Sequence, residues 1–272
     1  MPPTGAVSWR LGQLLGWLFA LVVCAVLVLP GLILIPMSFT AADFISFPPR
    51  GFSLRWYRQV LVEPQWRDAI VNSLLIALGA TTIAVAAGVP AAVVVRRLAQ
   101  RVFSDEAAAA LPLVVPTVVL GAGLYRWYLQ HGWVGTRSGL LLAHGMLGAP
   151  LVLLTLLATL RRIDPELENA ALTLGANRWK VLWTITLPLA LPGIVAGAFF
   201  AFITSFDEIA LSFFLTDAGM KTLPKVLFDQ ATYVLRPTLA VASTLLIVIS
   251  GAAAAVALAS ASGRTRAGQR SR

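Results

Sequence analysis

Long apolar blocks alternate with short polar segments along the whole chain. Each block is close to the roughly 20 apolar residues that a helix needs to cross a bilayer. Blocks of this length predict an all-α membrane protein whose helices span the bilayer. We place six spans within a single domain of residues 1–272, at about 12–37, 70–95, 107–129, 138–160, 191–214 and 238–261.

The composition agrees with this pattern. Of the 272 residues, 58% are hydrophobic and only 12% are charged, about half the charged fraction of a soluble domain. The apolar core of the first block is longer than that of a usual signal peptide, so we interpret it as an uncleaved span. The single cysteine, Cys24, lies in this block and has no partner for an intrachain disulfide.

The formal net charge of +9 could suggest a nucleic-acid partner. The basic residues, however, lie at the ends of apolar blocks, where they set membrane topology. Arg96 and Arg97 follow the second span, and an arginine-rich tail follows the sixth. Because cytoplasmic segments are rich in basic residues, we expect both termini and the segment of about 161–190 to be cytoplasmic, and we expect no nucleic acid to bind.

Motifs for enzymatic chemistry are missing from the sequence. There is no G-x-S-x-G elbow, no H-E-x-x-H pair and no phosphate-binding loop that ends in Gly-Lys-Ser/Thr. Of the two histidines, His144 lies in the fourth span, where we expect it to form a hydrogen bond within the bundle. We therefore predict a protein that is not an enzyme, with no catalytic residue, no metal site and no ATP site of its own.

Small residues recur at every fourth position in two spans. Such faces let helix backbones approach closely and are typical of packed membrane bundles. The positions are Ala80, Ala84 and Gly88 in the second span, and Gly193, Gly197 and Ala201 in the fifth.

Two neighbouring carboxylates, Asp207 and Glu208, fall inside the predicted fifth span, just after Ser205. A carboxylate at membrane depth costs at least ~2.5 kcal/mol on insertion scales, so it normally faces a cavity or a partner. Adjacent helix positions point about 100° apart, so both need not face the same groove. We identify Ser205, Asp207 and Glu208 as candidates for a cation pathway; the alternatives are a charge partner within the bundle or a position nearer the outer interface.

The polar stretch 168–188 contains Ala170-Ala171, then Gly175, then Ile185-x-Leu187-Pro188. This pattern resembles the cytoplasmic EAA loop of ABC importer permeases, with Asn169 at the position of the motif's Glu and Glu168 one residue earlier. The resemblance implies a short coupling helix, within a loop of about 161–190, that docks in a groove of an ATPase subunit. The residues expected to couple the two subunits are Glu168, Asn169, Ala170, Ala171, Gly175, Ile185 and Pro188.

Further segments, including 54–57, 72–74 and 205–208, are similar to the spermidine/putrescine class of these permeases. That resemblance implies a type I importer bundle in the bacterial inner membrane that transports putrescine or spermidine. It also implies as partners a second similar permease, two ATPase subunits that bind ATP and Mg, an extracytoplasmic solute-binding protein and membrane lipid. This chain itself would need no cofactor.

Two alternatives remain open from the sequence. One is a permease for another small solute, such as an aminophosphonate, an opine or an iron chelate, and the arginines of the predicted outer loops favour it. These are Arg50, Arg55, Arg58 and Arg67. The other is an ion-driven secondary carrier that needs no ATPase.

Overall fold

The computed structural model describes residues 5–99, 113–233 and 235–269, and all regular secondary structure in these ranges is helical. Five of the described helical segments are long and apolar enough to cross a membrane. They are Gly12–Ser38, Pro64–Arg97, Arg137–Leu160, Arg178–Asp207 and Pro237–Ala259. The predicted span 107–129 lies partly outside the described residues, and its described part contains helix α5 (Thr117–Gln130).

The chain divides into two compact units, which we describe separately. Unit 1 comprises residues 1–63 and 229–248 and contains α1 (Gly5–Ser38), α2 (Arg55–Val62) and the first part of α12 (Pro237–Gln269). An aromatic cluster organises the segment between α1 and α2, where the Phe39 ring lies 5.0 Å from the rings of both Phe52 and Tyr57. The indole N–H of Trp56 donates a hydrogen bond to the carbonyl of Ala42 at 3.2 Å.

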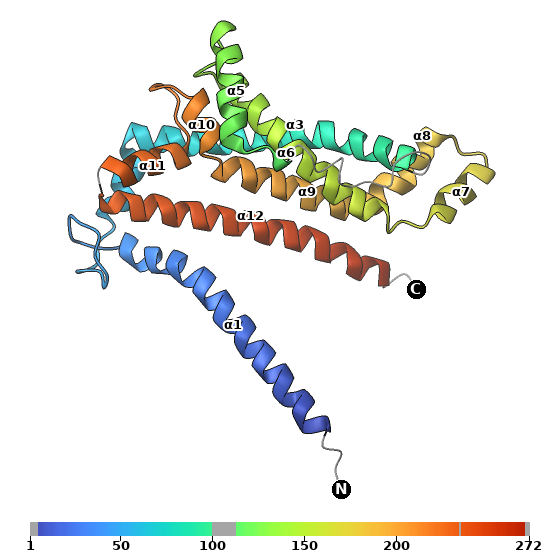
Figure 1. Cartoon of the computed structure of the whole chain (residues 1–272), viewed down its shortest axis with the longest axis horizontal. Helices are drawn as coiled ribbons and strands as arrows, with labels where there is room; N and C mark the ends of the chain where they lie inside the picture. The colour runs from blue at the N-terminus through green and yellow to red at the C-terminus, as the bar shows by residue number, and fades with distance from the viewer. Residues whose placement is uncertain (1–4, 100–112, 234, 270–272) are drawn as a thin grey trace. The chain divides into compact units, whose positions relative to one another are not determined.

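Unit 2 comprises residues 64–228 and 249–272. Its centre is formed by α3 (Pro64–Ala99), α6 (Arg137–Leu160) and α9 (Leu187–Asp207), which pack side by side (Figure 1). The predicted small residues of α3 and α9 are all buried at these contacts. A Cβ added to Gly197 would lie 2.9 Å from the Cα of Val152 on α6, so this packing tolerates only glycine without movement.

The predicted helix over 191–214 is wrong at both ends. α9 ends at Asp207, Glu208 is extended (φ −74°, ψ 118°), and a separate short helix, α10 (Ala210–Leu215), follows. In the other direction the helical span reaches back to Arg178 through α8 (Arg178–Val181) and a π-helical turn, η1 (Leu182–Thr186). The second half of the predicted 161–190 loop is therefore helical. Pro188 has no N–H to donate to the carbonyl four residues earlier, and the wider π-helical turn ends two residues before this proline.

Candidate functional site

The predicted coupling loop begins with α7 (Pro165–Thr173). The side chain of Asp164 caps this helix by accepting a hydrogen bond from the Glu166 amide at 2.9 Å. Beyond the helix end, the Gly175 amide donates to the Leu172 carbonyl and the Ala176 amide donates to the Ala171 carbonyl, both at 3.0 Å. This pair of bonds is a Schellman motif, with Gly175 in the left-handed position that such a turn requires.

Gly175 has φ +87°, and a Cβ placed there would meet nothing within 4 Å. The constraint on this residue is therefore its backbone conformation and not lack of space. The prediction that Gly175 ends the first helix of the loop and turns the chain is confirmed. Asn177 then starts α8, because its side-chain oxygen accepts a hydrogen bond from the Lys180 amide at 2.8 Å.

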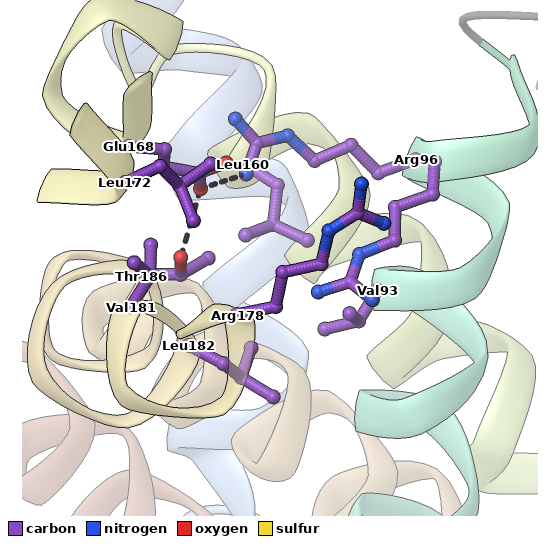
Figure 2. Close-up of a pocket in the computed structure, with 10 residues that line it drawn as sticks. Val93, Arg96, Leu160, Glu168, Leu172, Arg178, Val181, Leu182 and Thr186 are labelled. Carbon is purple, nitrogen blue, oxygen red and sulfur yellow. Dashed lines mark hydrogen bonds and ion pairs between the residues drawn. The ribbon is translucent and has the colours of Figure 1, made fainter. Parts of the chain in front are cut away.

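Glu168 is the best-connected side chain of the loop. Its carboxylate oxygen Oε1 accepts a hydrogen bond from Nη1 of Arg96 at 2.7 Å and another from Oγ1 of Thr186 at 2.8 Å (Figure 2). The Arg96 side chain is only 12% exposed and that of Glu168 26%. One acidic group thus attaches α7 to the end of α3 and to η1.

Some of the other predicted coupling residues are exposed and the rest are half-buried. Asn169 and Ala170 are exposed and Ala171 is half-buried on α7. Ile185 is half-buried in η1, and the exposed Pro188 lies in the first turn of α9. The residue at the motif's Glu position, Asn169, therefore faces outward, whereas Glu168 is bound inside the fold. Their part in coupling stays a prediction.

Large apolar side chains are also exposed along this loop. Leu174 is 90% exposed, Trp179 71% and Trp183 64%. Trp179 and Trp183 are one helical turn apart, so they lie on the same face of the α8–η1 helix. The loop consequently presents apolar and small side chains outward, while Glu168 is engaged inside the fold.

Ser205 lies near the other end of α9 and is buried between helices. Nδ1 of His144 on α6 is 2.9 Å from its Oγ and 3.2 Å from its carbonyl oxygen. The prediction that His144 forms a hydrogen bond within the bundle is thus confirmed. Ser205 is held in this buried contact, and its place on a substrate route stays a prediction.

Asp207 and Glu208 have different surroundings although they are neighbours in sequence. The half-buried Glu208 side chain accepts hydrogen bonds from the amides of Ala210 at 2.7 Å and Leu211 at 3.2 Å, which caps α10. Asp207 is exposed, and within the described residues its carboxylate has no hydrogen bond or ion pair. Of the two acids, only Asp207 presents a carboxylate that is not already engaged by the chain.

Sequence reasoning did not find the attachment through Arg96. That arginine was assigned a role in topology alone, and nothing in the sequence pairs it with a residue 72 positions away. Glu168 is one of three acids in the segment 164–168, so the sequence does not single it out as the partner of an arginine that ends an apolar helix. Within the described residues there is no group of three or more His, Cys, Asp or Glu side chains that could hold a metal.

The sequence matches a family described as the inner membrane component of binding-protein-dependent transport systems, over residues 106–265. The chain belongs to this family. The chain is also 33% identical over 254 residues to the putrescine transport system permease protein PotI of Escherichia coli, an alignment that covers 90% of this chain and 88% of that protein. The predicted kinship with spermidine/putrescine permeases is thereby confirmed.

Another relative in this family is the molybdenum transport system permease protein ModB of Mycobacterium bovis. It is 32% identical over 231 residues, which cover 77% of this chain and 86% of that protein. The fold is similar to that of a bacterial ABC transporter involved in the import of the polysaccharide alginate, with a TM-score of 0.65, 17% identity and 96% of each chain covered. The prediction of an all-α ABC importer permease is confirmed.

Family membership settles the general role of the chain. It is a permease component of an ABC importer in the inner membrane, and it works in a system that depends on a binding protein. The chain is a transport component and not an enzyme.

Proposed function

We propose that the chain forms half of the translocation pathway of a polyamine importer, with Asp207 as the carboxylate that meets the ammonium groups of putrescine or spermidine. The similarity to the E. coli putrescine permease supports the substrate class. The exposed and unengaged carboxylate of Asp207 supports the site. Glu208 contributes indirectly, because its capping of α10 fixes the backbone beside Asp207.

The outward side of α7 and of the turn that follows it is the proposed docking surface for the ATPase. Small side chains such as Ala170 allow a close approach, and Leu174 offers apolar area to bury. Because Glu168 attaches α7 to α3 and η1, a displacement of α7 by the ATPase is passed directly to two spans. This connection supplies a physical route from ATP-driven closure to helix movement.

The complete transporter in this proposal contains a second, similar permease and two ATPase subunits that bind ATP and Mg. An extracytoplasmic binding protein delivers the polyamine. Both termini and the α7–α8 loop lie on the cytoplasmic side, which is supported by the arginines that end α3 and follow the last span.

Uptake of labelled putrescine by cells that express the whole transporter tests Asp207. We expect Asp207→Asn to lower uptake about tenfold, the equivalent of one hydrogen bond to a charged group. Glu208→Gln is the matched control, because an amide oxygen still accepts the α10 hydrogen bonds. Co-purification with the ATPase reports assembly, and normal uptake in an assembled Asp207→Asn transporter would contradict the proposal.

The second candidate is a permease for an oxyanion, which the 32% identity to the molybdenum permease favours. The structure weakens the argument from basic outer loops, because Arg55 is paired with Asp43 at 2.6 Å and Arg67 with Asp68 at 3.1 Å. Binding of a panel of polyamines, aminophosphonates, opines, iron chelates and molybdate to the associated binding protein separates the candidates. Tight binding of an anion alone would reject the polyamine assignment.

A further inference from the structure

A cavity of about 350 Å³ lies beside α7, between the end of α3 and the start of the α8–η1 helix. Three arginines line it: Arg96 and Arg97 from α3, and Arg178 from α8. Figure 2 shows the side chains of Arg96 and Arg178 extending toward one another across this space. The cavity therefore concentrates positive charge at one end of the bundle.

One carboxylate, that of Glu168, faces the three guanidinium groups. It is already engaged by Arg96 and Thr186. Within the described residues, neither Arg97 nor Arg178 has a hydrogen bond or ion pair to an acid. Guanidinium groups that converge without a counter-charge form a site for an anion, and their planar donors match the oxygens of a phosphate.

The remaining walls are largely aliphatic and include Val93, Leu160 and Leu182. A free phosphate ion gains nothing from such walls, whereas a phosphate ester with attached carbon atoms can contact both halves of the lining. The chemistry of the cavity thus fits an amphiphilic phosphodiester better than a fully hydrated ion.

The position of the cavity identifies the source of such a group. The apolar span of α3 ends at Arg97 and the span that contains α9 begins at Arg178, so both arginines lie at an end of an apolar span. The exposed Trp179 and Trp183 follow Arg178 in the same helix, and tryptophan favours the interface between membrane and water. Phospholipid headgroups lie at this same depth, and basic pockets between membrane helices bind anionic headgroups.

We propose that this cavity binds the phosphodiester headgroup of an anionic membrane phospholipid. The headgroup supplies a counter-charge that Arg97 and Arg178 share. The site is independent of the transported solute and stands if the polyamine assignment fails.

Lipid titration of the assembled, detergent-purified transporter tests this site. After removal of endogenous lipid, short-chain phosphatidylglycerol is added and binding is followed by native mass spectrometry. The variants are Arg97→Gln, Arg178→Gln and the two combined. Arg162→Gln is the matched control, because Arg162 is an exposed arginine near the same loop that does not line the cavity. Phosphatidylcholine of the same chain length and inorganic phosphate form the comparison arms.

We expect phosphatidylglycerol to bind about fivefold more weakly for each arginine removed and about thirtyfold more weakly in the combined variant. Arg162→Gln should leave the affinity unchanged, and phosphatidylcholine should bind weakly throughout. Equal affinities in all variants, or equal binding of phosphatidylcholine, would overturn the proposal. Competition by inorganic phosphate at similar concentrations would show a simple anion site. Loss of the ATPase from the combined variant with lipid binding intact would assign the arginines to an acidic group of that subunit.

Discussion

The chain is interrupted at both ends of the helical span Arg178–Asp207, and the two interruptions are closed in different ways. The segment 174–177 turns through Gly175 in a left-handed conformation and restarts on the neutral cap Asn177. The break at 208–209 contains no residue with positive φ and is closed by the carboxylate of Glu208, which accepts two amide hydrogen bonds. A water-exposed turn can leave some amides to solvent, whereas a break in half-buried surroundings needs an internal acceptor.

The same comparison applies to charge. Beside each end of this span one carboxylate is engaged inside the fold, Glu168 at the α7 loop and Glu208 at the α10 break. Each end also has a nearby charged side chain that forms no ion pair among the described residues, Arg178 at one end and Asp207 at the other. Glu168 and Glu208 therefore stabilise the fold, whereas Arg178 and Asp207 are the candidates for binding a ligand.

The largest effect should come from removing Glu168. Glu168→Ala leaves Arg96 largely buried without its acceptor, which costs about 1.5–3 kcal/mol for a hydrogen bond to a charged group and shifts α7 roughly ten- to 150-fold toward detachment. Detachment of α7 should be seen as faster amide hydrogen exchange in α7 and as lower transport-linked ATP hydrolysis. Glu166→Ala, an exposed acid in the first turn of the same helix, is the control. Unchanged amide exchange of α7 in Glu168→Ala would show that the Glu168–Arg96 pair does not stabilise the position of α7.

A smaller effect is expected at Gly175. Gly175→Ala places a Cβ in the left-handed conformation at a cost of about 1–2 kcal/mol. Gly132→Ala is a close match, because Gly132 has φ +67° and a Cβ there also meets nothing within 4 Å. Both variants should lose similar thermal stability, but only Gly175→Ala should lower transport-linked ATP hydrolysis. Equal ATP hydrolysis in the two variants would contradict a role of the turn at Gly175 in coupling.

The long helices and the α7 turn could be predicted because their signals are local. A block of about 20 apolar residues identifies a span, and a glycine after a polar helix identifies its end. The small residues of α3 and α9 were likewise found from spacing alone, and the structure buries them. Each of these features depends on residues within one or two helical turns.

The break after Asp207 and the attachment of Glu168 could not be predicted, for two physical reasons. Between Ser205 and Leu215 there is no glycine or proline, and the apolar pattern continues through Ile209 and Leu211, so nothing in the residues signals a helix end. The Glu168–Arg96 pair joins residues 72 positions apart, and only the packed bundle brings them together. The arginine-lined cavity could not be predicted for the same reason, because its lining comes from four separate segments of the chain.

The smallest effect concerns the cap of α10 and tests the separation of Asp207 from Glu208. Glu208→Ala removes the acceptor of two amides and should cost about 1 kcal/mol, seen as a lower unfolding temperature and faster amide exchange in α10. Asp207→Asn should leave both quantities unchanged while lowering uptake, because that carboxylate forms no hydrogen bond or ion pair with the described residues. Glu208→Gln should resemble the parent protein in both assays, since its amide oxygen keeps the acceptor. If Glu208→Gln instead lowers uptake as strongly as Asp207→Asn, then the charge of Glu208 also acts on the solute, and capping is not its only role.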